Sequence, residues 1–115
     1  MLNTIIIEGR CTSDVELKKT QANQDVAIFN IANEDAKKNV TYFSCEAWGK
    51  TAEHISKYFK KGDGIEIVGR LTIRKFTRKD GTAGERASIV VETVYFPLSR
   101  KQHESAEFDD SNAPA

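Results

Sequence analysis

Aromatic and cationic side chains share one stretch of the chain, residues 64–84, and their types suit binding rather than bond chemistry. Read as a strand, the stretch places Phe76 on one side with Arg74 and Arg78, because strand side chains alternate sides. Cations neutralise phosphates and a ring stacks on a base, so the pattern is typical of a surface for single-stranded nucleic acid. Between residues 70 and 79 stand five cations and no carboxylate, namely Arg70, Arg74, Lys75, Arg78 and Lys79. In the alternative interpretation, Phe76 covers a neighbouring strand and the charges form a solvated edge.

A second aromatic set lies in residues 40–48, which also read as a strand. Tyr42 and Trp48 share one side of it, and the opposite side, with Thr41, Phe43, Cys45 and Ala47, is expected to pack inward. If both strands belong to one curved sheet, Tyr42, Trp48 and Phe76 line a single groove. The alternative, that the two aromatic residues of this strand close the end of the core, stays open because tryptophan is usually largely buried.

Residues that could support catalysis or hold a metal lack the required spacing. Gly49-Lys50-Thr51 resembles the end of a phosphate-binding loop, but the glycine that such a loop needs five residues earlier is replaced by Ser44. His54 and His103 have no Cys or His partner at metal-binding distance in the sequence. We therefore predict no enzymatic activity, no catalytic residue, no metal site and no cofactor.

The elements that must position the aromatic residues follow from periodicity and turn signals. Strands are predicted at residues 4–10, 26–33, 40–48, 64–78 and 85–96, and a helix at 50–60. A helix between strands three and four of five predicts an all-β OB-fold, a five-stranded Greek-key barrel. In the last two strands we expect a core-facing side made of Ile65, Ile67, Gly69, Leu71, Ile73, Ala87, Ile89 and Val91. The loop at 33–39 presents Lys37 and Lys38.

Composition fits one domain at residues 1–100 followed by a short, acidic, disordered tail at 101–115. The chain has no net charge, but the tail holds four acids and one lysine, so the body is basic and suits an anionic partner. Cys11 and Cys45 fit no disulfide framework and predict free thiols in a reducing compartment. With no signal peptide and no apolar run long enough to span a membrane, we expect a cytoplasmic protein without membrane contact.

The chain resembles the bacterial-type single-stranded DNA-binding proteins, including those encoded by phages, over most of residues 1–98. The resemblance is carried by NTIIIEGR, VAIFNIAN, FSCEAWGKTAEHISKYFKKG, IVGRLTIRKFTRKDG and VVETVYF. It implies an OB-fold, usually a homotetramer, that binds single-stranded DNA with little sequence preference and protects it in replication, recombination and repair. It also implies that Trp48 and Phe76 stack on bases, and Tyr42 falls where many members carry Trp. Lys50, Lys61, Arg74 and Lys75 fall on positions that neutralise phosphate.

The chain departs from the family pattern in two places. The loop at 33–39 has no aromatic residue, whereas many members place another stacking ring there. The tail has almost no linker and ends in Asn-Ala-Pro-Ala rather than in acids followed by Pro-Phe. The signature for recruiting replication or repair proteins is therefore incomplete. The acidic tail and the missing loop aromatic favour an alternative function, a primosomal-type OB-fold adaptor that binds partner proteins and contacts nucleic acid weakly.

Overall fold

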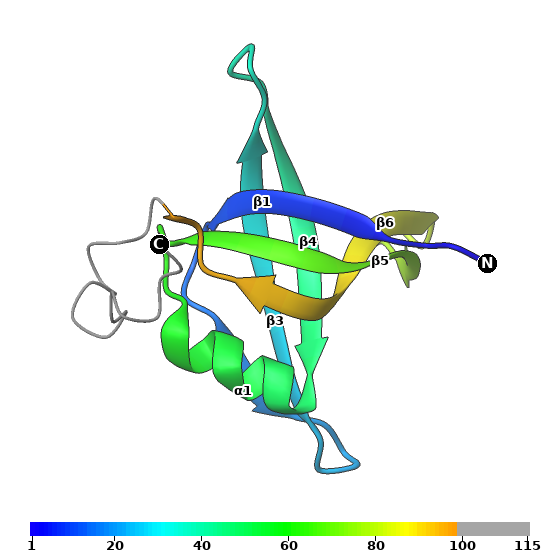
Figure 1. Ribbon diagram of the computed structural model, residues 1–115. Helices are drawn as coiled ribbons and strands as arrows, with labels where there is room; N and C mark the ends of the chain where they lie inside the picture. Colours follow the sequence, from blue (N-terminus) through cyan, green and yellow to red (C-terminus); the bar gives the residue numbers. More distant parts are fainter. Residues whose placement is uncertain (99–115) are drawn as a thin grey trace.

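The structure is a computed structural model that describes residues 1–98, and Figure 1 shows its strands wrapped around one core with a helix against one end. The elements are β1 (Ile5–Cys11), β2 (Glu16–Lys19), β3 (Asp25–Glu34), β4 (Val40–Trp48), α1 (Gly49–Tyr58), β5 (Gly64–Thr77) and β6 (Ala83–Tyr95). The predicted strands and helix are all present, with ends that shift by a few residues. The tail predicted at 101–115 lies outside the described residues.

The sheet closes on itself because β1 pairs with two strands. The strand order is β1-β5-β6-β4-β3-β2, and β1 also pairs with β3, so five strands form the barrel and β2 lies at the edge beside β3. All pairings are antiparallel except β4 with β6, which are parallel over three residue pairs from Ser44 with Ser88 to Glu46 with Val90. With the helix between β4 and β5, this is the predicted OB-fold.

The core lies inside the barrel and under α1. Phe29, Ile31, Ile65, Ile67 and Ile89 are almost wholly buried there. Ala52 and Ile55 form the buried side of α1, and Phe59, directly after the helix, is buried with them. The apolar spacing predicted for the helix is therefore confirmed, although the helix ends at Tyr58 rather than at residue 60.

Two hairpins extend beyond the barrel, and the predicted core-facing pattern is wrong where they do so. Leu71 and Ile73 are 40% and 53% exposed, and Ala87 is also exposed. These residues lie on the correct side of their strands, but β5 and β6 continue as a two-stranded arm with no core beneath it (Figure 1). Thr41 is exposed for the same reason in the arm formed by β3 and β4.

The two cysteines are buried and are not joined in a disulfide, as predicted. Burial raises the pKa of the Cys45 thiol to about 12, so this side chain is neutral over the physiological pH range. Within residues 1–98, no helix has the length and apolar character needed to cross a membrane.

Candidate nucleic-acid interface

A groove of about 660 Å³ runs across the outside of the barrel where β4 and β6 meet. Its lining comes from β3, β4, β5 and β6 and combines apolar, aromatic and cationic side chains. The main lining residues are Val26, Ile28, Glu46, Trp48, Arg74, Phe76, Arg86 and Ser88. The groove thus brings Trp48 and Phe76 together, whereas Tyr42, which was expected to share the groove with them, is not among the residues that line it. The residues lining it on β3 and β6 had not been predicted.

Phe76 lies against the backbone of the neighbouring strand. It is paired across β5 and β6 with Gly84, and a Cβ atom added to that glycine would lie 2.6 Å from Cζ of the ring. The guanidinium carbons of Arg78 and Arg86 lie 5.5 and 5.6 Å from the ring centroid, within the range of cation–π attraction. The ring is 39% exposed. The absence of a side chain at Gly84 of β6 therefore makes room for an aromatic ring that has two cations close to it.

Trp48 is fixed by a carboxylate two residues earlier on the same side of β4. The indole Nε1–H donates a hydrogen bond of 2.8 Å to Oε2 of Glu46. The other carboxylate oxygen of Glu46 accepts from Nη2 of Arg74 and forms an ion pair with it. The Glu46 side chain is only 10% exposed, whereas that of Arg74 is 54% exposed. Trp48 itself is 41% exposed, so its ring is anchored at the nitrogen and remains partly open to solvent.

Arg86 is the cation that sequence reasoning missed. It lies directly across from Arg74 on the β5–β6 hairpin and lines the groove beside Phe76. The sequence feature that could have located Arg86 is the Asp80-Gly81 turn. In the structure, Asp80 accepts hydrogen bonds from Thr82, and Gly81 has a φ of 90°. A turn centred on these residues sets the hairpin register and therefore places position 86 opposite position 74.

The remaining predicted cations near the groove are exposed but point in different directions. Lys50 lies in the first turn of α1, two residues after Trp48. Lys75 faces away from Arg74, because neighbours on a strand alternate sides, and is paired with Glu85. Arg70 is exposed on β5, and Lys79 lies in the turn after it. None of these four cations is among the residues that line the groove, and Lys75 lies on the opposite side of the hairpin.

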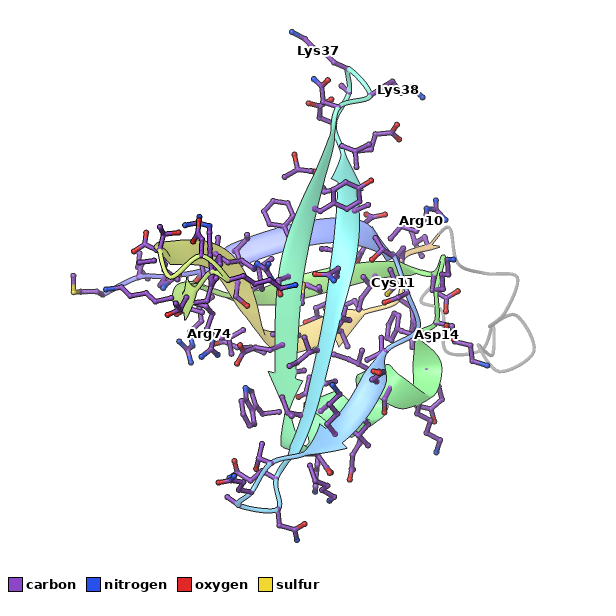
Figure 2. All side chains as sticks on the ribbon, turned by 180° about the vertical axis from the view of Figure 1, so that it is seen from behind. Arg10, Cys11, Asp14, Lys37, Lys38 and Arg74 are labelled. Carbon is purple, nitrogen blue, oxygen red and sulfur yellow. The ribbon has the colours of Figure 1, made fainter. Side chains whose placement is uncertain are left out.

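Tyr42, Lys37 and Lys38 belong to the β3–β4 arm and do not line the groove. Tyr42 is 70% exposed. Figure 2 shows Lys37 and Lys38 at the tip of the arm, away from Arg74. The loop that carries them is organised by Asp35, whose carboxylate accepts hydrogen bonds from the backbone N–H groups of Asn39 and Lys37. These bonds, that from Asn39 first, hold the pKa of Asp35 below its usual value.

Lys61 lies on the other side of the barrel from the groove. Its backbone N–H donates a hydrogen bond of 2.9 Å to Oδ1 of Asp14. Figure 2 shows Asp14 with Arg10 and Cys11 on the side opposite Arg74. A strand of nucleic acid would have to wrap around the barrel to contact both Lys61 and the groove.

The site has the composition of a binding surface for bases and phosphates. Across residues 1–98, no three His, Cys, Asp or Glu side chains gather in a way that could hold a metal ion. Aromatic rings with open faces can stack on bases, and the arginines around them can contact phosphates. The geometry therefore favours the binding of a single strand.

Comparisons with known proteins agree with this geometry. Residues 2–97 match the model of the single-strand binding protein family. Single-stranded DNA-binding protein 1 of Streptococcus pyogenes is 32% identical over 112 residues, which cover 92% of this chain and 85% of the relative. The single-stranded DNA-binding protein of Oceanobacillus iheyensis is 32% identical over 102 residues, which cover 84% of this chain and 63% of the relative. Single-stranded DNA-binding protein 3 of Streptococcus agalactiae is 30% identical over 110 residues, covering 90% of this chain and 80% of the relative.

The close approach of Phe76 to Gly84 gives a prediction about the ring. In Gly84→Ala, the added methyl group should displace the half-exposed ring, at a cost in unfolding free energy below the roughly 1–3 kcal/mol of overpacking a closed core. In the unmodified protein, the Gly84 α-protons should show an upfield ring-current shift in NMR spectra, and Phe76→Leu should abolish it. Gly64→Ala is the control, because a Cβ atom added there would lie 3.2 Å from its nearest neighbour, a Pro97 side-chain atom, whereas at Gly84 the distance to the ring is 2.6 Å. The control should leave the Phe76 ring where it is. An unshifted Gly84 signal in the unmodified protein would contradict the packing.

Proposed function

The chain belongs to the single-strand binding protein family, and from this premise we propose that it binds single-stranded DNA with little sequence preference. Bases stack on Trp48 and Phe76, and the cations in and around the groove neutralise phosphates. The observation that carries the proposal is that one groove contains both rings and two arginines, Arg74 and Arg86.

Weak sequence preference follows from the kinds of groups in the groove. Every base has a π-face, so stacking on an exposed ring accepts all four bases. The wall of the groove opposite the arginines is apolar, with Val26 and Ile28 from β3. Apolar side chains offer no donor or acceptor pattern by which one base edge could be chosen over another.

The first prediction of this function concerns the two rings. Trp48→Ala and Phe76→Ala should each weaken binding of oligo-dT on the order of tenfold or more, because stacking is worth roughly 1–3 kcal/mol per base. Both rings are about 40% exposed, at 41% and 39%, so the thermal unfolding midpoint should change little. Fluorescence anisotropy of a labelled oligonucleotide measures the affinity, and circular dichroism measures the fold. Unchanged affinity in a folded variant would remove that ring from the site.

The second prediction concerns the salt dependence of affinity. Each phosphate neutralised on a single strand contributes about 0.7 to the slope of log K against log salt concentration. Arg86→Gln should therefore make the slope shallower by about this amount per phosphate lost. Arg10→Gln is the matched control, since Figure 2 shows Arg10 on the side opposite Arg74, and should leave the slope unchanged. Equal effects of the two variants would place the phosphates elsewhere.

We extend the proposal to a homotetramer that acts in the cytoplasm and protects single strands during replication, recombination and repair. Ile6 supports an assembly, because it projects from the outer side of β1 and is 79% exposed. Symmetric association is the usual way to cover such apolar surface. Light scattering at micromolar concentration should give the mass of a tetramer, and Ile6→Lys should lower it. A monomeric mass for the unmodified protein would contradict the assembly.

A second function, that of an OB-fold adaptor for partner proteins, is favoured by one observation. The β3–β4 arm carries Tyr42, Lys37 and Lys38 but has no aromatic residue in its loop, so its tip offers no ring for stacking. An adaptor would leave the groove rings unused. The oligo-dT measurements above separate the two functions, because an adaptor binds the oligonucleotide weakly and loses little affinity when Trp48 or Phe76 is replaced.

A further inference from the structure

A carboxylate stands in the middle of a groove that is otherwise suited to a polyanion. Glu46 lies between Trp48 and Arg74 and binds both, through the indole N–H and the guanidinium group. Its side chain is 10% exposed, so the charge is largely removed from water. Burying a charge is costly unless partners compensate, and here the two partners are themselves parts of the proposed binding surface.

The ion pair changes what the groove can bind. The positive charge of Arg74 is already balanced by Glu46, and a phosphate placed beside the pair would meet a carboxylate. Arg86 and Arg78 differ, because neither forms an ion pair with a carboxylate in residues 1–98. The uncompensated positive charge therefore lies around the Phe76 ring, while the part of the groove between Trp48 and Arg74 is close to neutral.

We propose that Glu46 is a positioning and specificity-determining residue, which holds the Trp48 ring in place and turns the bases of a bound strand, rather than its phosphates, into the part of the groove between Trp48 and Arg74. This inference rests on the proposed binding of single-stranded DNA. Rejection of the wrong orientation by an unfavourable charge is a common source of specificity. Phosphates then lie at Arg86 and Arg78 around the Phe76 ring, where the positive charge is uncompensated.

Glu46→Gln tests the orientation, because it keeps an oxygen that can accept from the indole but removes the charge. Sodium polyphosphate, a polyanion without bases, should displace labelled oligo-dT from this variant more effectively than from the unmodified protein, on the order of tenfold at low salt. The slope of log K against log salt for oligo-dT should also steepen by about 0.7, because Arg74 becomes available to a phosphate. The matched control is Glu85→Gln, which removes the same charge from an exposed residue on β6 outside the groove lining. Its polyphosphate competition should change less than twofold.

A measurement on the protein without DNA tests whether Glu46 holds the Trp48 ring in place. Trp48 is the single tryptophan of the chain, so its fluorescence anisotropy without DNA reports the mobility of this one ring. Anisotropy should fall in Glu46→Ala, which removes the hydrogen-bond acceptor, and should be restored in Glu46→Gln. An unchanged value in Glu46→Ala would overturn the positioning role, even if that variant were less stable.

The outcomes separate this inference from the proposed function. Equal effects of Glu46→Gln and Glu85→Gln on polyphosphate competition would overturn the role of Glu46 in orientation and leave single-strand binding intact. An unmodified protein that binds polyphosphate as tightly as oligo-dT would instead overturn single-strand binding through the rings, and the orientation with it.

Discussion

The short parallel pairing of β4 with β6 is the interaction on which the site depends. It spans three residue pairs, and one of them joins Glu46 to Val90. The strands come from two different hairpins, each of which is antiparallel and could form locally. Only their pairing places Trp48 of one hairpin in the same groove as Phe76 and Arg86 of the other. The closure of the barrel through β1 holds the two hairpins in this arrangement.

Charge within the groove is organised by the same pairing. Arg74 and Arg86 face each other across the β5–β6 hairpin, and like charges directly opposite each other destabilise a sheet. Glu46 arrives from β4 and forms an ion pair with Arg74, so one of the two charges is balanced. The other remains beside the Phe76 ring. A hairpin that would repel itself in isolation is thus compatible with the folded barrel.

The sequence was sufficient to predict the order of elements, the OB-fold and the side of its strand on which each of Trp48 and Phe76 lies, because strand alternation is local. That the two rings share one groove depends on the pairing of β4 with β6, which local patterns do not show. It was not sufficient for Glu46, whose importance depends on Arg74, 28 positions further along the chain. Leu71 and Ile73, which were predicted to face the core but are exposed, show a second limit of prediction from periodicity. Periodicity identifies the side of a strand on which a residue lies, but it does not show where the core beneath that side ends. Every predicted binding role remains a prediction, and those of Tyr42, Lys37, Lys38 and Lys61 concern residues outside the groove lining.

The position of β6 after every other strand of residues 1–98 has a consequence for the newly made chain. β6 supplies Arg86 and the Gly84 backbone beneath Phe76, and it pairs with both β4 and β5. A chain still on the ribosome that lacks residues 83–95 therefore has Trp48 and the first arginines but no groove. Since pairings between distant segments form slowly, assembly of the groove should be a late step in folding. A nascent chain can thus acquire the groove only after nearly all of the barrel has been synthesised.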